Sequence, residues 1–269
     1  HDHPDPDHDG DGGSDEGETG ASASEVASGS ALVDWPLFGR VPQRTHYLAA
    51  DEEALDPPLK QAWSINTHAL IEFPPAIHDG VAYVINKYGN GKAVRLRDRK
   101  VLWELNIRPS DKGKPNFVTA PVYYEGRVYG AFLTGHLAAG DAETGKKGWV
   151  RKFDAHLESS PLAVVGTLYL GTDTTDLIPL RASDRKTRCS FCSPGAIKAS
   201  PSYDDGKVFF ADYQSSVFAL DAKSGKPVWR TNTSKVPPFG RGGFFSSPAI
   251  GFGRVYAARD DGTVYAFDE

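Results

Sequence analysis

Residues 201–230 read PSYDDGKVFFADYQSSVFALDAKSGKPVWR, and this stretch predicts a small antiparallel β-sheet. An apolar pair follows Pro201, and two further apolar runs cover residues 207–211 and 217–220. The turn-forming segments Asp204–Gly206 and Asp221–Lys226 flank these runs, and such segments mark the ends of short strands. A fourth apolar segment carries Trp229. The stretch is therefore expected to form four short strands.

The same pattern occurs five times along the chain with fixed internal offsets. The copies start at Pro75, Pro121, Pro161, Pro201 and Pro248, which lie 46, 40, 40 and 47 residues apart. Five residues after each proline stands a glycine: Gly80, Gly126, Gly166, Gly206 and Gly253. Twenty-eight residues after the proline, wherever the chain reaches that far, stand Trp103, Trp149, Cys189 and Trp229. Four-stranded units of about 40 residues are the blades of β-propellers, so we predict an all-β propeller with five visible repeat units.

The residues of these copies resemble the PQQ-like repeat family, also called quinoprotein-type or BamB-like propellers. The likeness rests on the Ser247-Pro248 start, on the run Val264–Asp268 and on the segment 219–229, ALDAKSGKPVW. The segment 35–39, WPLFG, with Thr45 and Tyr47 also resembles the segment that precedes the first blade in bacterial members. The resemblance covers about residues 35–269. It implies the fold but not the function, since one scaffold carries enzymes and non-enzymes.

The resemblance also implies structural roles for the tryptophans, because in this family the recurring indole docks between neighbouring blades. We assign this role to Trp63, Trp103, Trp149 and Trp229. Residues 59–64 (LKQAWS) are similar to a fourth strand that lacks the rest of its unit, and the last copy lacks its own fourth strand. We therefore expect residues 59–64 to complete the last blade. Members usually have seven or eight blades, so the chain forms either a five-bladed ring or part of a larger one.

Composition divides the chain into three regions. Residues 1–30 hold nine acidic residues, no Lys or Arg and almost no large apolar side chain, which predicts a disordered acidic tail. Residues 31–58 are expected to be an extended lead-in segment, and residues 59–269 the propeller. Residues 31–269 carry 30 basic against 26 acidic side chains, too small an excess to indicate nucleic-acid binding. The absence of an initial Met favours signal-peptide removal or trimming of a longer chain, and we expect an exported protein, extracellular, periplasmic or on the cell surface.

Two metal sites can be suggested within the tail. Asp5, Asp7, Asp9 and Glu16 have the spacing of an EF-hand calcium loop, but the apolar anchor and flanking helices are missing. An acidic solubilising tail explains the same residues more simply. A free amino terminus with His3 would suit Cu(II) or Ni(II).

The two cysteines, Cys189 and Cys192, lack the partners that zinc or haem attachment requires. The turn-forming Ser193-Pro194-Gly195 follows them. We expect a local disulfide in place of the missing tryptophan, because an exported protein meets an oxidising environment.

Two connections between blades are longer than the others and combine basic with aromatic residues. Both join a fourth strand to the next first strand, so they should lie on one face of the propeller. Their candidate partner-binding residues are Arg108, Lys112, Lys114 and Phe117 in one, and Phe239, Arg241, Phe244 and Phe245 in the other. Binding residues concentrate in such loops. Ordinary surface with partly buried phenylalanines is the alternative.

From these features we predict a non-catalytic exported binding or scaffold propeller without a cofactor. Its partner is expected to be a protein or another component of the cell envelope, with contact to the membrane that is peripheral at most. The alternative is a PQQ-dependent dehydrogenase with calcium. Enzymes of that type carry a disulfide between adjacent cysteines, whereas Cys189 and Cys192 are separated by two residues.

Overall fold

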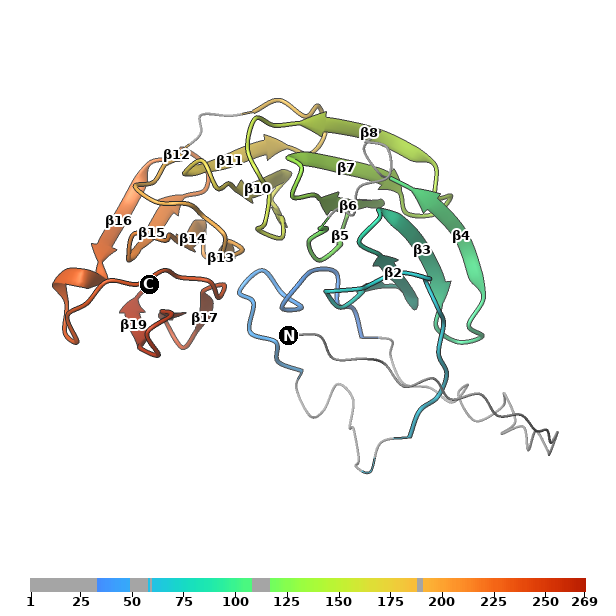
Figure 1. Ribbon diagram of the computed structural model, residues 1–269, viewed down its shortest axis with the longest axis horizontal. Coiled ribbons are helices and arrows are strands. Elements are labelled where there is room, and N and C mark those ends of the chain that lie inside the picture. Colours follow the sequence, from blue (N-terminus) through green and yellow to red (C-terminus); the bar gives the residue numbers. More distant parts are fainter. Residues whose placement is uncertain (1–32, 49–57, 59, 108–116, 188–190) are drawn as a thin grey trace, which may run out of the picture.

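The computed structural model describes residues 33–48, 58, 60–107, 117–187 and 191–269. These residues form five antiparallel sheets arranged in sequence order along an arc around a common axis (Figure 1). The strands are β1 (Ala76–His78), β2 (Val81–Ile85), β3 (Asn90–Arg95) and β4 (Val101–Asn106) in blade 1; β5 (Val122–Tyr124), β6 (Arg127–Ala131), β7 (His136–Asp141) and β8 (Lys147–Lys152) in blade 2; β9 (Leu162–Val164), β10 (Thr167–Gly171), β11 (Asp176–Arg181) and β12 (Phe191–Cys192) in blade 3; β13 (Ser202–Asp204), β14 (Lys207–Ala211), β15 (Ser216–Asp221) and β16 (Pro227–Asn232) in blade 4; and β17 (Ala249–Gly251), β18 (Arg254–Ala258) and β19 (Val264–Asp268) in blade 5. The predicted all-β propeller of PQQ-like blades is confirmed.

Helical structure is nearly absent from the described part of the chain. It contains one short 3₁₀ helix, η1 (Thr233–Lys235), which follows β16. A membrane-crossing helix, which must be long and apolar, is not found among the described residues.

The repeated glycine has a conformational reason in every blade. It occupies the second central position of the hairpin between the first and second strands, with φ of +77° at Gly206 and +69° at Gly253. The residue before it also has positive φ, for example +38° at Asp205. Two consecutive positive φ values define the type I′ turn, whose twist matches that of the flanking strands. Glycine adopts this conformation without steric cost.

The repeated tryptophans lie at the interfaces between consecutive blades. The Trp103 indole nitrogen donates to the carbonyl of Ala142 in blade 2 at 2.9 Å. Its ring packs so closely on the turn of that blade that a Cβ on Gly145 would come within 2.6 Å of it. Trp149 packs into the core cluster shared by blades 2 and 3. Trp229 lies 5.8 Å from the Phe267 ring of blade 5. Each indole therefore joins its own blade to the next.

The prediction that residues 59–64 complete the last blade is wrong for this structure. Blade 5 has three strands, and residues 60–69 contain no strand. Hydrogen bonds instead hold residues 67–70 on blade 1. The Lys87 backbone N–H donates to the Leu70 carbonyl at 2.9 Å, and the Asn86 side-chain amide donates to the Thr67 carbonyl. Blade 1 and blade 5 are the two ends of the arc (Figure 1). The segment that follows is thus attached to blade 1, and Trp63 lies in a stretch that forms no strand.

The lead-in segment was expected to be extended, but residues 33–48 turn repeatedly and lie at the propeller axis. Its carbonyls accept hydrogen bonds from the amides of four innermost strands: Trp35 from Ile77, Pro36 from Tyr123, Pro42 from Tyr203 and Gln43 from Ile250, all between 2.7 and 2.9 Å. The Arg44 side chain reaches the carbonyls of Pro201, Ser160 and Pro161, at the start of blades 3 and 4. We call residues 33–48 the axial hub, because they contact every blade.

Candidate functional site

An open hollow of about 480 Å³ lies beside the axial hub. Its wall combines aromatic rings, small hydroxyl side chains, the buried Arg44 and one pair of opposite charges. The lining residues are Phe38, Arg44, Thr45, His46, Phe73, Glu158, Ser160, Lys198, Ser200, Phe245, Ser246, Ser247 and Ala249. We call this feature the axial hollow. A concave site with a mainly apolar wall and a few polar groups is the usual form of a binding site.

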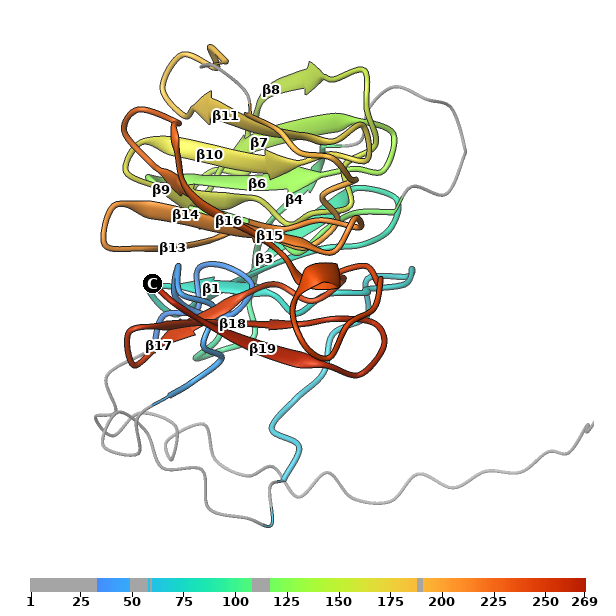
Figure 2. The same cartoon turned by 90° about the vertical axis from the view of Figure 1, so that its left-hand side faces the viewer.

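The fold brings these residues together because all connections from a fourth to a next first strand run on one face. Glu158 lies in the β8–β9 connection, Lys198 in the β12–β13 connection and Phe245 in the β16–β17 connection. The side view shows η1, which begins the β16–β17 connection, at the face opposite to the end of β19 (Figure 2). The axial hollow therefore opens on the face of the long connections.

The aromatic part of the wall is a chain of edge-to-face contacts. The ring of Phe38 lies 4.9 Å from His46 and 6.1 Å from Phe73, and Phe73 lies 5.8 Å from Phe117. Phe245 packs on Tyr213 at 4.5 Å. Edge-to-face geometry places the positive edge of one ring on the negative face of the next.

Two cations line the axial hollow, one paired with a carboxylate and the other bound to backbone carbonyls. Lys198 pairs with Glu158 at 3.2 Å, and its ammonium lies 5.0 Å from the Tyr213 ring. Burial lowers the pKa of Lys198, but the hydrogen bond and charge of Glu158 outweigh this, so the net shift is upward. Arg44 is 2% exposed, and burial lowers its pKa to about 9, so it stays protonated at neutral pH. Burial, and secondly the charge of Arg44, lowers the pKa of His46.

Seven of the eight predicted partner-binding residues fall into three groups. Phe245, 57% exposed, lines the axial hollow, and Phe117 reaches it through Phe73. Phe239 and Arg241 are exposed on the β16–β17 connection. Arg108, Lys112 and Lys114 lie outside the described residues.

Phe244 was predicted to bind a partner, and the structure corrects this prediction. It is fully buried and packs 6.2 Å from Tyr265 in the core between blades 4 and 5. An exposed partner cannot reach this side chain without opening the core. Sequence analysis missed Phe38, Phe73, Glu158 and Lys198, which also line the hollow. Glu158 and Lys198 stand three residues before Pro161 and Pro201, as Phe245 stands before Pro248, but the residue type at this offset differs from copy to copy.

The other predicted sites fall largely outside the described residues. This is true of Asp5, Asp7, Asp9 and Glu16, of the amino terminus with His3, and of Cys189. Cys192 is exposed, and its sulfur lies 3.1 Å from Asp176 Oδ1. The Cys189–Cys192 bond stays a prediction. Within the described ranges, no group of three His, Cys, Asp or Glu side chains is arranged to hold a metal ion.

The axial hollow does not fit a quinone held by calcium. Calcium takes six to eight oxygen ligands, rich in carboxylates. Among the described lining residues the one carboxylate is that of Glu158, and Lys198 already pairs with it. The Arg44 guanidinium is directed at backbone carbonyls, so it is not available to an anionic ligand.

The fold and the repeats define a propeller of PQQ-like blades, and comparison with known families places it more closely. The family model described as outer membrane protein assembly factor BamB matches residues 59–191 and 134–269. The chain belongs to this family.

Relatives within this group include both enzymes and an assembly factor. The dehydrogenase subunit of a quinone alcohol dehydrogenase from Komagataeibacter europaeus is 28% identical over 239 residues, which cover 81% of this chain and 28% of that protein. The outer membrane protein assembly factor BamB of Nitrosomonas eutropha is 29% identical over 169 residues, covering 62% of this chain and 39% of that protein. The chain thus matches less than half of the length of either relative.

A solved structure shows the same fold. The quinohemoprotein alcohol dehydrogenase of Comamonas testosteroni superposes with a TM-score of 0.71 at 17% identity, covering 92% of this chain and 49% of that one. Identity this low supports the shared fold alone.

Proposed function

We propose that this chain is a non-catalytic, exported binding propeller that holds a protein partner of the cell envelope at the axial hollow. The observation that carries the proposal is the composition of its wall. Exposed Phe245 supplies an aromatic anchor, the hydroxyls of Ser246 and Ser247 supply hydrogen-bonding groups, and the carboxylates that a calcium-quinone site needs are not among the described lining residues. Aromatic residues in a concave setting are typical anchors of protein interfaces. The relation to an outer membrane protein assembly factor supports an envelope partner.

A photocrosslinking experiment tests this proposal. A photoreactive phenylalanine analogue replaces Phe245 in one variant and Phe252 in a control. Phe252 is fully exposed in the β17–β18 turn, which lies on the opposite face. We expect discrete crosslinked protein species in the producing cells from position 245 and not from position 252. Equal patterns from both positions would contradict the axial hollow as the binding site.

A titration with PQQ and calcium tests the alternative. The binding proposal predicts that the purified protein does not retain PQQ in a one-to-one ratio after dialysis, as measured by absorbance. Stoichiometric retention would favour the quinone-dependent dehydrogenase instead, as the relation to the alcohol dehydrogenases allows. Glu158→Gln serves as a control, because it removes the one described carboxylate of the hollow.

A further inference from the structure

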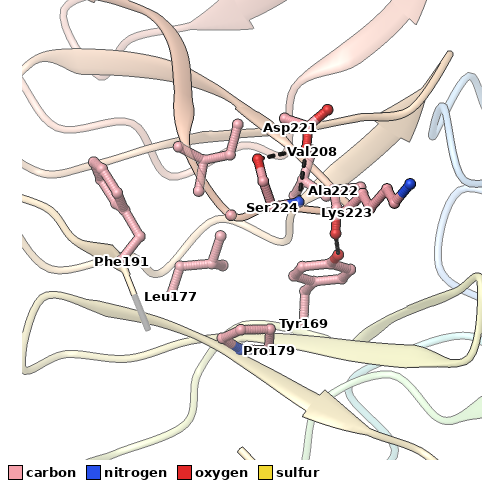
Figure 3. Close-up of a pocket in the computed structure, with 11 residues that line it drawn as sticks. Tyr169, Leu177, Pro179, Phe191, Val208, Asp221, Ala222, Lys223 and Ser224 are labelled. Carbon is pink, nitrogen blue, oxygen red and sulfur yellow. Dashed lines mark hydrogen bonds between the residues drawn. The ribbon is translucent and has the colours of Figure 1, made fainter. Parts of the chain in front are cut away.

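The interface between blades 3 and 4 contains a pocket at the place where the other interfaces hold a tryptophan. Its lining residues are Tyr169, Leu177, Pro179, Phe191, Val208, Leu220 and the turn residues Asp221–Gly225 (Figure 3). Trp103 stands opposite Ala93 in blade 1 and Trp149 opposite Ala139 in blade 2, and Pro179 has the corresponding place on β11. In the sequence, the repeat offset of these tryptophans falls on Cys189 in the third copy. A cysteine side chain is far smaller than an indole.

The aromatic neighbour of the missing indole is retained. Trp103 lies 6.0 Å from Tyr83, Trp149 lies 6.0 Å from Tyr129, and Trp229 lies 6.1 Å from Phe209. Tyr169 has the equivalent position on β10 and forms one wall of the pocket. The partner ring for an indole is therefore present although the indole of this repeat is not.

The hydrogen-bond acceptor is retained as well. In the first interface Trp103 donates its indole N–H to the carbonyl of Ala142. The equivalent carbonyl in the pocket is that of Ala222, which accepts the Tyr169 hydroxyl at 3.0 Å (Figure 3). A carbonyl oxygen has two lone pairs, so it can accept a second donor beside Tyr169.

The pocket at Tyr169 is larger than the hollow beside Trp103, as expected where the indole is missing. The hollow beside Trp103, lined also by Tyr83, Leu105 and Val128, measures about 10 Å³. The pocket at Tyr169 measures about 80 Å³. A single water molecule needs roughly 10–15 Å³ on this measure, so the pocket has space for a larger group. Leu177, Val208 and Phe191 make much of its wall apolar, which favours an aromatic ring over water.

We propose that this pocket binds the indole ring of a ligand, with the ring packed on Tyr169 and its N–H donating to the Ala222 carbonyl. The ligand carries the same indole group as the side chain of Trp103, but it is a separate molecule. The inference does not depend on the function proposed for the axial hollow, which lies elsewhere.

Binding can be measured with fluorinated probes and ¹⁹F NMR. We use 5-fluoroindole to represent a free small molecule and N-acetyl-5-fluorotryptophanamide to represent a side chain on a polypeptide. Saturable binding of either probe is expected, and the arm that binds more tightly identifies the source. With 1-methyl-5-fluoroindole, which lacks the N–H, binding should be roughly threefold to tenfold weaker. Absence of saturable binding of both probes to folded protein would overturn the proposal.

Variants connect the binding to this pocket. Cys189→Trp supplies the ring from the chain itself and should abolish probe binding. The matched control Cys189→Ala, which also lacks the predicted Cys189–Cys192 bond, should keep binding and have a lower Tm than Cys189→Trp. Tyr169→Phe frees the Ala222 carbonyl and should bind at least as tightly, since Phe209 already has this position beside Trp229. Unchanged binding in a folded Cys189→Trp protein would contradict the assignment.

A measurement on the unaltered protein covers the case in which Cys189→Trp does not fold. In protein with labelled leucine and valine methyl groups, 5-fluoroindole should shift the signals of Leu177, Val208 and Leu220. The signal of Leu37 in the axial hub should stay unchanged, since it lies outside the pocket. Shifts at Leu37 without shifts at Leu177 would show that the probe binds elsewhere.

Discussion

Trp103→Ala is expected to lower the free energy of unfolding by about 3–5 kcal/mol, the usual range for removal of a packed tryptophan. Three losses contribute to this effect. The interface between blades 1 and 2 loses the ring, the carbonyl of Ala142 loses its donor, and the surface of Gly145 loses the group packed on it. Chemical denaturation followed by circular dichroism measures the change.

A second tryptophan in the same part of the chain provides the control. Trp63 lies before blade 1 in a segment that forms no strand. Trp63→Ala should therefore cost much less than Trp103→Ala, about 1 kcal/mol or less, as expected away from a packed interface. Equal losses in the two variants would show that Trp103 does not act as an interblade anchor.

The repeating part of the fold could be predicted from the sequence because each blade depends on local chemistry. Gly206 allows a type I′ turn, and the same turn is needed at Gly253 one unit later. Trp103 and Trp149 keep one offset because each must reach the turn of the following blade. Five copies of one pattern therefore supply five observations of the same physical requirement.

Features that occur once in the chain could not be predicted in this way. Phe244 and Phe245 are neighbours in a loop, yet one is buried and the other 57% exposed. No strand period distinguishes them there, because residues 236–248 of the connection form neither helix nor strand. The placement of residues 60–69 likewise depends on their contacts with blade 1 and on the separation of blade 5 from blade 1. The spacing of repeats in the sequence reveals neither of these.

The axial hub shows the same limit for the candidate site. A single arginine in a polar segment usually indicates surface, whereas Arg44 is 2% exposed. Its partners are backbone carbonyls of Phe38, Ser160, Pro161 and Pro201. Backbone acceptors leave no mark on residue type, so the sequence does not identify them.

Arg44→Met is the second variant with a large expected effect. Methionine keeps much of the aliphatic volume but removes every donor of the guanidinium. The carbonyls of Pro201 and Ser160 then stay buried without this partner, and a hydrogen bond to a charged group contributes about 1.5–3 kcal/mol. We expect a loss of about 3 kcal/mol in the free energy of unfolding, somewhat reduced because burial of the charge itself is unfavourable, as the lowered pKa of Arg44 shows.

Two further variants decide whether the geometry of Arg44 or merely its charge matters. Arg44→Lys keeps the charge but replaces the planar fork by one ammonium, which cannot reach carbonyls from two blades with the same geometry. It should recover only part of the loss. Arg254→Met removes an exposed arginine that pairs with Asp268 at 3.0 Å, and surface pairs of this kind contribute about 0–1 kcal/mol. Urea denaturation compares the three proteins. Because Arg44 binds the axial hub to blades 3 and 4, Arg44→Met should also speed proteolytic cleavage within residues 33–48. If its cleavage rate and stability equal those of Arg254→Met, Arg44 is not what holds the axial hub in place.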